Sequence, residues 1–365
     1  MKKLRVLVIG PSTQGAKGGM ATVLNVMRED AALNSKADLT FYSSYIEAPF
    51  FKKACYCLWR LLRCILLLPK YDVIHIHSTA FASAFRKALY VYLAKMAGKK
   101  VIIHLHTAQY VDYYLNLSPW KQRFLRRSLE LSDLVLCLSD VLKRYCEASI
   151  GLKHCAVLNN SIDTDHYGRI HEEKGAYPHQ LLFLGKVVPG KGVYDLIEVL
   201  RRLKEEGKPV SCIIAGDGET DKLGALVESY GLQDLVQLPG WVDGDKKMEL
   251  LKNCTALILP SYREGLPMSI LESMAAGKAI ISTAIAAIPE VVEEGVNGWL
   301  FQPGDQEALY QILLNYRENQ ELCLKMGRRN YEKARAKYSS AKLLDELYHH
   351  YRRVAGVEDR SEANV

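Results

Sequence analysis

Short apolar runs alternate with helical patterns through most of the chain. In the first part, six runs are rich in Val, Ile and Leu, as in parallel strands that are covered on both faces. They lie at residues 4–10, 39–43, 72–78, 100–107, 134–139 and 155–160. Helical stretches lie between them, near residues 20–30, 51–68, 81–97, 119–131 and 140–148. This alternation predicts a doubly wound parallel sheet.

A second series of strands and helices follows residues 161–180, a polar stretch with Gly and Pro that is typical of a linker. Its strands are expected at residues 181–186, 210–217, 235–240, 256–261, 279–283 and 298–301, and helices close the chain between 305 and 355. We therefore expect an α/β protein of two Rossmann-like parallel-sheet domains, which places a cleft between the carboxyl ends of their sheets. The expected parts are domain 1–165, domain 166–340, a helix 341–355 that packs back on the first domain, and a flexible tail 356–365.

Composition narrows the class of protein. The chain has 365 residues, of which 49% are hydrophobic and 24% charged, as in an ordinary folded protein. Its nine cysteines are scattered without the spacing of a zinc or redox site, which indicates reduced thiols in a cytosol. The apolar run after Lys2 and Lys3 is too short for a signal peptide. These features predict a cytoplasmic protein.

Charge is distributed unevenly along the chain. Residues 1–160 carry 23 Lys and Arg against 10 Asp and Glu, whereas residues 161–365 carry 25 against 31. The basic first part suggests an anionic partner, such as phosphates, anionic lipid or nucleic acid. The basic residues lie in amphipathic helices rather than in known nucleic-acid modules, so no nucleic-acid partner is expected.

The sharpest motif is SYREGLPMSILESMAAGKAIIST at residues 261–283. A strand ends at Pro260, a loop holds Glu264 and Gly265, and a helix begins at Pro267. The first turn of that helix offers unpaired N–H groups and a positive dipole, so it can hold a diphosphate. Glu264 and Glu272 suit sugar hydroxyl groups, although an N-cap acid and a solvated helix acid are equally consistent with the spacing.

Three further segments favour an anion or sugar site. Lys186 and Lys191 follow a strand and could clamp a diphosphate, or be ordinary surface lysines. Gly18 and Gly19 could let backbone amides approach an anion. In addition, Asp217 follows Gly216 at a strand end.

Histidines cluster on two neighbouring strands. His104 and His106 end the fourth strand, and His75 and His77 form a similar pair on the third, where packing is the alternative to ligand contact. The D-x-D sequences at 163–165 and 243–245 are common by chance, so we expect no metal site.

The spacing of Glu264 and Glu272 in EGLPMSILESMAAGKAIIST resembles the signature of retaining glycosyltransferases of family four, which have the GT-B fold. Residues 286–305, 184–192, 213–219, 132–139 and 159–167 are also similar to that family. The family usually has Arg where this chain has Lys186, which removes bidentate geometry there. The resemblance implies catalytic roles for His106, Glu264 and Lys191, with His104 behind His106. It implies a donor site made of Gly18, Gly19, Lys186, Lys191, Gly216, Asp217, Glu264, Gly265, Leu266 and Glu272.

The resemblance implies metal-independent hexosyl transfer from a UDP- or GDP-sugar, with retention of configuration and no cofactor besides the donor. The acceptor expected from it is a lipid-linked glycan in surface polysaccharide biosynthesis. Two alternatives remain: a soluble GT-B enzyme, such as a storage-glucan synthase or a sugar-nucleotide epimerase, and a noncatalytic membrane-associated partner.

Residues 50–68, FFKKACYCLWRLLRCILLL, predict an amphipathic helix. On a helical wheel, Lys52, Lys53, Arg60 and Arg63 share one face, and apolar residues occupy the rest. This is typical of a helix lying on an anionic membrane, with its basic groups towards lipid. It predicts a protein peripheral to the inner face of the cytoplasmic membrane. A buried helix with a basic edge is the alternative.

Overall fold

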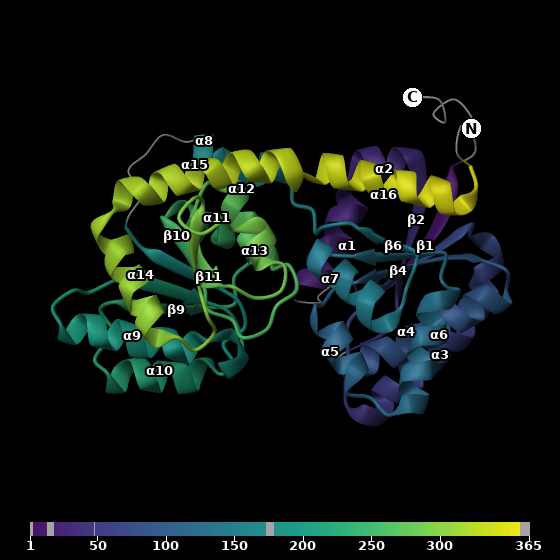
Figure 1. The fold of residues 1–365 in the computed structure, drawn as a ribbon, viewed down its shortest axis with the longest axis horizontal. Coiled ribbons are helices and arrows are strands. Elements are labelled where there is room, and N and C mark those ends of the chain that lie inside the picture. The colour runs from purple at the N-terminus through teal and green to yellow at the C-terminus, as the bar shows by residue number, and fades with distance from the viewer. Residues whose placement is uncertain (1–2, 13–17, 47, 173–178, 358–365) are drawn as a thin grey trace. The chain divides into compact units, whose positions relative to one another are not determined.

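The computed structural model describes residues 3–12, 18–46, 48–172 and 179–357. It divides into two compact units, shown in Figure 1. Unit 1 consists of residues 1–161 and 340–365, and unit 2 consists of residues 162–339. Among the described residues, no helix is both long and apolar enough to cross a membrane.

Unit 1 contains a six-stranded parallel sheet in the order β2-β1-β3-β4-β5-β6. Its strands are β1 Leu4–Gly10, β2 Ala37–Ser43, β3 Val73–Ser78, β4 Lys100–Leu105, β5 Leu134–Cys137 and β6 Cys155–Val157. Its helices are α1 Gly19–Glu29, α2 Ala31–Lys36, α3 Phe50–Leu67, α4 Ala82–Met96, α5 Gln109–Leu115, α6 Pro119–Leu131, α7 Asp140–Tyr145 and α16 Ser340–Ala355, with short helical turns η1 Leu68–Lys70 and η2 Cys146–Ile150.

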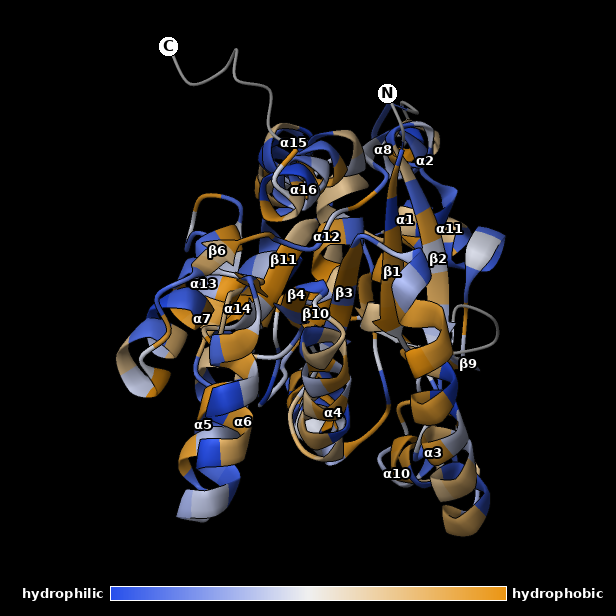
Figure 2. Cartoon of the chain, turned by 90° about the vertical axis from the view of Figure 1, so that its right-hand side faces the viewer, coloured by the Kyte–Doolittle hydropathy of each residue, from blue (hydrophilic) through white to orange (hydrophobic). Residues whose placement is uncertain are grey.

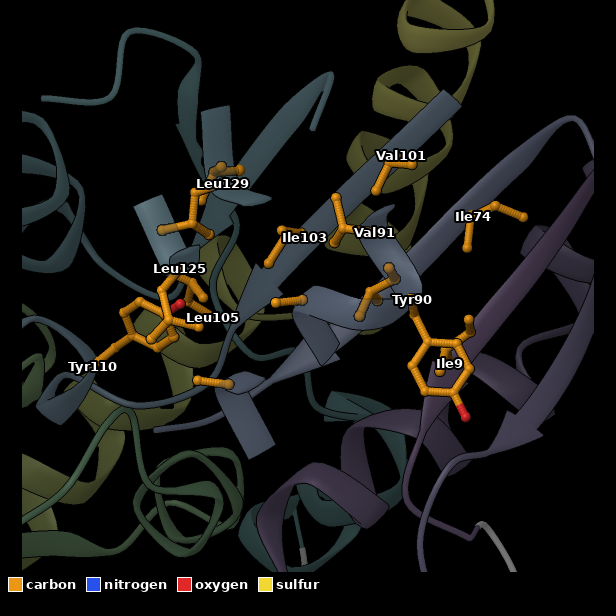
Figure 3. Close-up of a cluster of buried hydrophobic side chains, with 14 of the residues drawn as sticks. Ile9, Ile74, Tyr90, Val91, Val101, Ile103, Leu105, Tyr110, Leu125 and Leu129 are labelled. Atoms are coloured by element: carbon orange, nitrogen blue, oxygen red, sulfur yellow. The ribbon is translucent and has the colours of Figure 1, made fainter. Parts of the chain in front are cut away.

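The two faces of this sheet differ in chemistry. One face forms an apolar core with α4, α5 and α6, and Figure 3 shows Ile74, Ile103 and Leu105 from β3 and β4 pointing into it. Because successive strand residues point to opposite faces, His75 and His77 lie on the other face. That second face packs against α16. The histidine pattern of β3 and β4 is therefore confined to one side of the sheet.

Unit 2 contains a second six-stranded parallel sheet, in the order β12-β11-β10-β7-β8-β9. Its strands are β7 Leu181–Leu184, β8 Cys212–Ala215, β9 Val236–Gly240, β10 Ala256–Leu259, β11 Ala279–Thr283 and β12 Gly298–Phe301. Its helices are α8 Thr164–Glu172, α9 Val193–Glu205, α10 Thr220–Ser229, α11 Gly244–Lys252, α12 Met268–Ala275, α13 Ile288–Val291, α14 Gln306–Glu318 and α15 Gln320–Lys337, with the short turn η3 Pro189–Lys191.

The two predicted parallel sheets are confirmed, and every predicted strand is present. Some strands are shorter than predicted because their last polar residues turn away from the sheet; β4, for example, ends at Leu105. The stretch 161–180, interpreted as a linker, contains helix α8, which packs on α12. Tyr167 and Ile170 of α8 are buried, so Thr164–Glu172 belongs to the body of unit 2.

Helix α3 turns its apolar side outwards. Phe50, Phe51, Leu58, Trp59, Leu62, Ile65 and Leu66 are between 44% and 82% exposed, and Figure 2 shows α3 with much of its length in the hydrophobic colour. Cys64 is the buried residue of the helix. The alternative of a buried helix is therefore wrong.

The predicted outward basic face of α3 also needs correction. Arg60 points towards the sheet, where its Nε donates to the Ser43 carbonyl at 2.7 Å and its guanidinium lies 3.5 Å from the centre of the Tyr42 ring. Lys53 is half-buried over the Tyr45 ring. Lys52 and Arg63 are the exposed cations of this helix. Stacking on tyrosine rings explains why a basic side chain is favoured on the inner side.

Candidate active site

The sheet of unit 2 has its topological switch point between β7 and β10. From β7 the chain adds β8 and β9 on one side, and then returns to add β10, β11 and β12 on the other. The loops that follow the carboxyl ends of β7 and β10 therefore diverge. Open α/β sheets bind their ligands at such a point. The first of these loops carries Lys186 and Lys191, and the second carries Glu264, Gly265 and Leu266.

An ion pair joins these two loops. The Lys191 Nζ donates to the Glu264 Oε1 at 2.5 Å, and the Glu264 side chain is only 9% exposed. A buried carboxylate requires a cation or hydrogen-bond donors, so the pair holds both groups in place. Lys186 is exposed on the same loop and makes no ion pair within the described part of the chain. The structure thus brings Lys191 and Glu264 together and leaves Lys186 open to solvent.

Two glycines allow this close approach of loops. A Cβ on Gly192 would lie 1.9 Å from the Pro260 carbonyl oxygen, and Gly192 has a positive φ of 67°. A Cβ on Gly216 would lie 1.7 Å from the Gly185 carbonyl oxygen. A side chain at either position would force the backbones apart. Gly216, predicted to touch the donor, therefore has a packing reason to be glycine.

Helix α12 begins at the same edge of the sheet. Its N-cap is Pro267, and its first residues follow the Glu264 loop directly. The first-turn N–H groups of a helix have no partner within the helix, which makes this end attractive to an anion. Glu272 lies farther along α12 and is buried, with 5% of its side chain exposed.

Lys247 of α11 neutralises Glu272, and no sequence motif marks this lysine. Its Nζ donates to the Glu272 Oε1 at 2.7 Å. Burial alone would favour the neutral amine, but Glu272 and Tyr167 outweigh it and raise the pKa of Lys247 above its usual value. In sequence Lys247 is typical of a solvated lysine, whereas in the structure its ammonium lies over the ring of Tyr167 on α8. A nucleotide hydroxyl that bonds Glu272 would meet a carboxylate already fixed by this cation.

Unit 1 has its own switch point, between β1 and β3. Gly18 is the N-cap of α1, which follows β1 and begins at Gly19; Gly18 has a positive φ of 111° that favours glycine. Residues 13–17 of this glycine turn lie outside the described part of the chain. Lys87 of α4 is buried beside this switch point, where its Nζ donates to the Ile9 carbonyl and the Ser44 hydroxyl. Burial holds the pKa of Lys87 well below its usual value.

His106 follows β4 and is hydrogen-bonded to His77. His77 Nδ1 and His106 Nε2 are 2.7 Å apart, and the backbone N–H of His106 donates to the Ser78 carbonyl. Burial, reinforced by neighbouring imidazoles, holds the pKa of His77 and of His106 well below the usual value. His106 is therefore neutral near pH 7 and can form a hydrogen bond with a hydroxyl group. His104 lies deeper on the same face, and its Nε2–H donates to the Leu158 carbonyl at 3.2 Å.

Two family models match consecutive parts of the chain. "Glycosyltransferase Family 4" matches residues 23–166, and "Glycosyl transferases group 1" matches residues 169–333. Together they span most of both units. The chain belongs to glycosyltransferase family 4. Its two parallel sheets are those of the GT-B fold, and both the family and the fold expected from the motifs are confirmed.

Two curated relatives illustrate what this family member is similar to. A putative colanic acid biosynthesis glycosyltransferase, WcaL of Escherichia coli, is 28% identical over 249 residues, which are 66% of this chain and 60% of that protein. The N-acetyl-alpha-D-glucosaminyl L-malate synthase of Bacillus anthracis is 26% identical, over 75% of this chain and 73% of the relative. The chain thus matches about 60% of the length of WcaL.

Solved structures share the fold at low identity. Anabaena Alr3699/HepE in complex with UDP has a TM-score of 0.75 at 18% identity, covering 96% of this chain and 100% of that one. The sucrose-phosphate synthase of Thermosynechococcus elongatus has a TM-score of 0.77 at 15% identity, covering 98% and 100%.

Proposed function

We propose that this family member transfers a sugar from a nucleoside-diphosphate sugar, with a uridine or guanosine base, to a glycan acceptor in bacterial polysaccharide synthesis, with retention of configuration. The observation that carries the proposal is the Lys191–Glu264 pair at the β7/β10 switch point, beside the start of α12. A cation and a helix N-terminus suit a diphosphate, and the carboxylate suits the hydroxyl groups of the sugar. Relatives from colanic acid synthesis and a fold neighbour that binds UDP support the same reading.

In the proposed reaction, the bond between the anomeric carbon and the diphosphate oxygen breaks while the acceptor oxygen forms its bond on the same face. The acceptor proton passes to the departing phosphate oxygen. Lys191 and the α12 N-terminus stabilise the negative charge that develops on the diphosphate. Lys186, the Gly18–Gly19 turn and the turn at Gly216 and Asp217 are further proposed donor contacts. Glu272 is assigned to the ribose, and Glu264 with neutral His106 to the transferred sugar.

A panel of UDP- and GDP-sugars tests this proposal. Incubation of the full chain with each donor should release free nucleoside diphosphate from one donor above the others, and more quickly when membrane glycolipids are added as acceptors. Nucleotide-sugar binding without turnover in the presence of acceptor would favour the noncatalytic partner. Accumulation of an epimerised sugar or of a free glucan would instead favour the alternative soluble enzymes.

We also propose that the acceptor is lipid-linked and that unit 1 binds an anionic membrane through α3. The exposed apolar side of α3 supports this, since large contiguous apolar surfaces mark interaction sites. Lys52 and Arg63 flank that side and could reach lipid phosphates. Next to it, an apolar groove of about 350 Å³ is bordered by Leu58 and Leu61 of α3 and by Leu89 of α4.

Vesicle sedimentation measures this interaction. We expect the chain to pellet with vesicles that contain anionic phospholipid at low salt, and to be released in part at high salt because the cationic contribution is screened. Changing Leu58 and Leu62 to Gln should reduce the pelleted fraction several-fold, and the change of Lys52 and Arg63 to Gln should remove the salt dependence. Arg60 and Lys53 stay unchanged in both variants, because their side chains contact Ser43 and Tyr45 within unit 1.

The matched control is Leu324→Gln, an exposed leucine on α15 of unit 2. It should pellet as the unaltered chain does. Equal recovery of the unaltered chain in the supernatant with and without anionic vesicles would contradict membrane binding, while leaving the donor reaction untouched.

A further inference from the structure

Three buried histidines converge on one face of the unit 1 sheet. His75 and His77 are alternate residues of β3, so their side chains leave the strand on the same side. His104 of β4 is the direct cross-strand partner of His77. One ring nitrogen from each of these three residues lies within 4.8 Å of those of the other two. The strand register alone therefore gathers three imidazoles at one place.

Each of the three rings uses one nitrogen for a hydrogen bond. His75 Nδ1 lies 2.8 Å from the Tyr351 hydroxyl, and His104 Nε2 lies 3.2 Å from the Leu158 carbonyl. His77 Nδ1 lies 2.7 Å from His106 Nε2. In each ring, therefore, one nitrogen is held by a hydrogen bond and the second nitrogen takes no part in that bond.

The other nitrogens are His75 Nε2, His77 Nε2 and His104 Nδ1. All three atoms are buried, and within the described part of the chain none has a hydrogen-bond partner. Leaving a buried polar atom unpaired is unfavourable, so three in one cluster call for an explanation. A ligand that accepts three nitrogen lone pairs would satisfy them together.

One tautomer assignment gives all three free nitrogens a lone pair. His104 must donate its Nε2–H to the Leu158 carbonyl, which leaves Nδ1 with the lone pair. His77 can donate Nδ1–H to His106, and His75 can donate Nδ1–H to the Tyr351 oxygen. Metal-bound histidines usually have this arrangement, with the second ring nitrogen held by a carbonyl or another polar group.

We propose that His75, His77 and His104 bind one zinc ion, through His75 Nε2, His77 Nε2 and His104 Nδ1, with water at the fourth position. A set of three neutral imidazoles suits zinc or a similar transition metal and does not suit magnesium or calcium, which prefer oxygen. Zinc–nitrogen bonds of about 2.0–2.1 Å place tetrahedral ligands about 3.3 Å apart. One nitrogen of each ring already lies within 4.8 Å of one in each of the other two rings, so binding requires the side chains to rotate towards the ion. This site is distinct from the diphosphate site of unit 2. Through the His77 hydrogen bond, the ion would fix His106 with its proton on Nδ1.

Metal analysis of the full chain, prepared without a polyhistidine tag, tests the proposal. After stripping with a chelator, reloading with Zn²⁺ and washing with a weak chelator, we expect about one zinc ion per chain. His104→Asn and His75→Gln should each lower the retained zinc at least tenfold. His166→Asn, at an exposed position of α8, is the matched control and should retain it. No retained zinc in the unaltered chain, or equal retention in all variants, would overturn the proposal.

Cobalt spectroscopy keeps the test decisive if a histidine variant fails to fold. Co²⁺ in the unaltered chain should give the intense visible bands of a tetrahedral site without a thiolate charge-transfer band. Weak octahedral bands would refute the site. A strong near-ultraviolet thiolate band would also refute it, because it would assign the metal to some of the nine free cysteines. Neither readout depends on sugar transfer, so failure of this site and failure of the proposed reaction are distinguishable.

Discussion

Replacement of Glu264 by Gln, or of Lys191 by Ala, should each lower sugar transfer at least about tenfold, which corresponds to roughly 1.4 kcal/mol or more of transition-state binding. Glu264→Gln keeps the shape of the side chain but removes the charge that holds Lys191 at 2.5 Å. Lys191→Ala removes a cation from the developing diphosphate. Initial rates with the donor selected from the UDP- and GDP-sugar panel provide the measurement.

Stability must be measured beside activity, since Lys191→Ala leaves a nearly buried carboxylate without its cation. Glu264→Gln is free of that problem, because an amide needs no counter-charge. Lys204→Ala is the matched control: Lys204 also pairs with a carboxylate of unit 2, Asp234 at 2.7 Å, but both groups are exposed. It should transfer sugar at the unaltered rate. Unaltered rates in both Glu264→Gln and Lys191→Ala, in folded protein, would remove the proposed donor site.

The strands of both units could be predicted from the sequence because buried parallel strands leave a local signal. Runs such as residues 4–10 and 279–283 are continuous apolar segments, and the structure places strands with the same bounds there. Helix α8 was missed because its sequence is mostly polar. Its identity as a helix depends on Tyr167 and Ile170 packing into unit 2, which is tertiary information.

Partners of the candidate site residues were harder to predict than the residues themselves. Glu264 and Glu272 stand in a recognisable motif, whereas their cations, Lys191 and Lys247, lie 73 and 25 positions away in the chain. A helical wheel gave the correct apolar surface of α3, but it could not say which side meets the sheet. Arg60 therefore appeared to face lipid, although it stacks on Tyr42.

Gly192 shows most clearly what the structure adds to the sequence motif. It follows Lys191 in a glycine-containing turn, and the sequence alone does not distinguish it from Gly190. In the structure, Gly192 is buried, has a positive φ of 67° and lies against the carbonyl of Pro260, the residue that follows β10. Gly190 is exposed, and its added Cβ would meet nothing within 4 Å in the described part of the chain.

Gly192→Ala should therefore destabilise the chain by about 2–4 kcal/mol, because overpacking against a backbone carbonyl adds to the strain of a positive φ. Donor hydrolysis should fall at least tenfold even where the protein remains folded, since separation of the η3 turn from β10 pulls Lys191 away from Glu264. Gly190→Ala, two residues away in the same turn, should change the free energy of unfolding by less than about 0.5 kcal/mol. Urea unfolding and donor hydrolysis of the two variants, measured side by side, provide the comparison. If Gly192→Ala matched Gly190→Ala in both assays, the close approach of these loops would not position the proposed donor site.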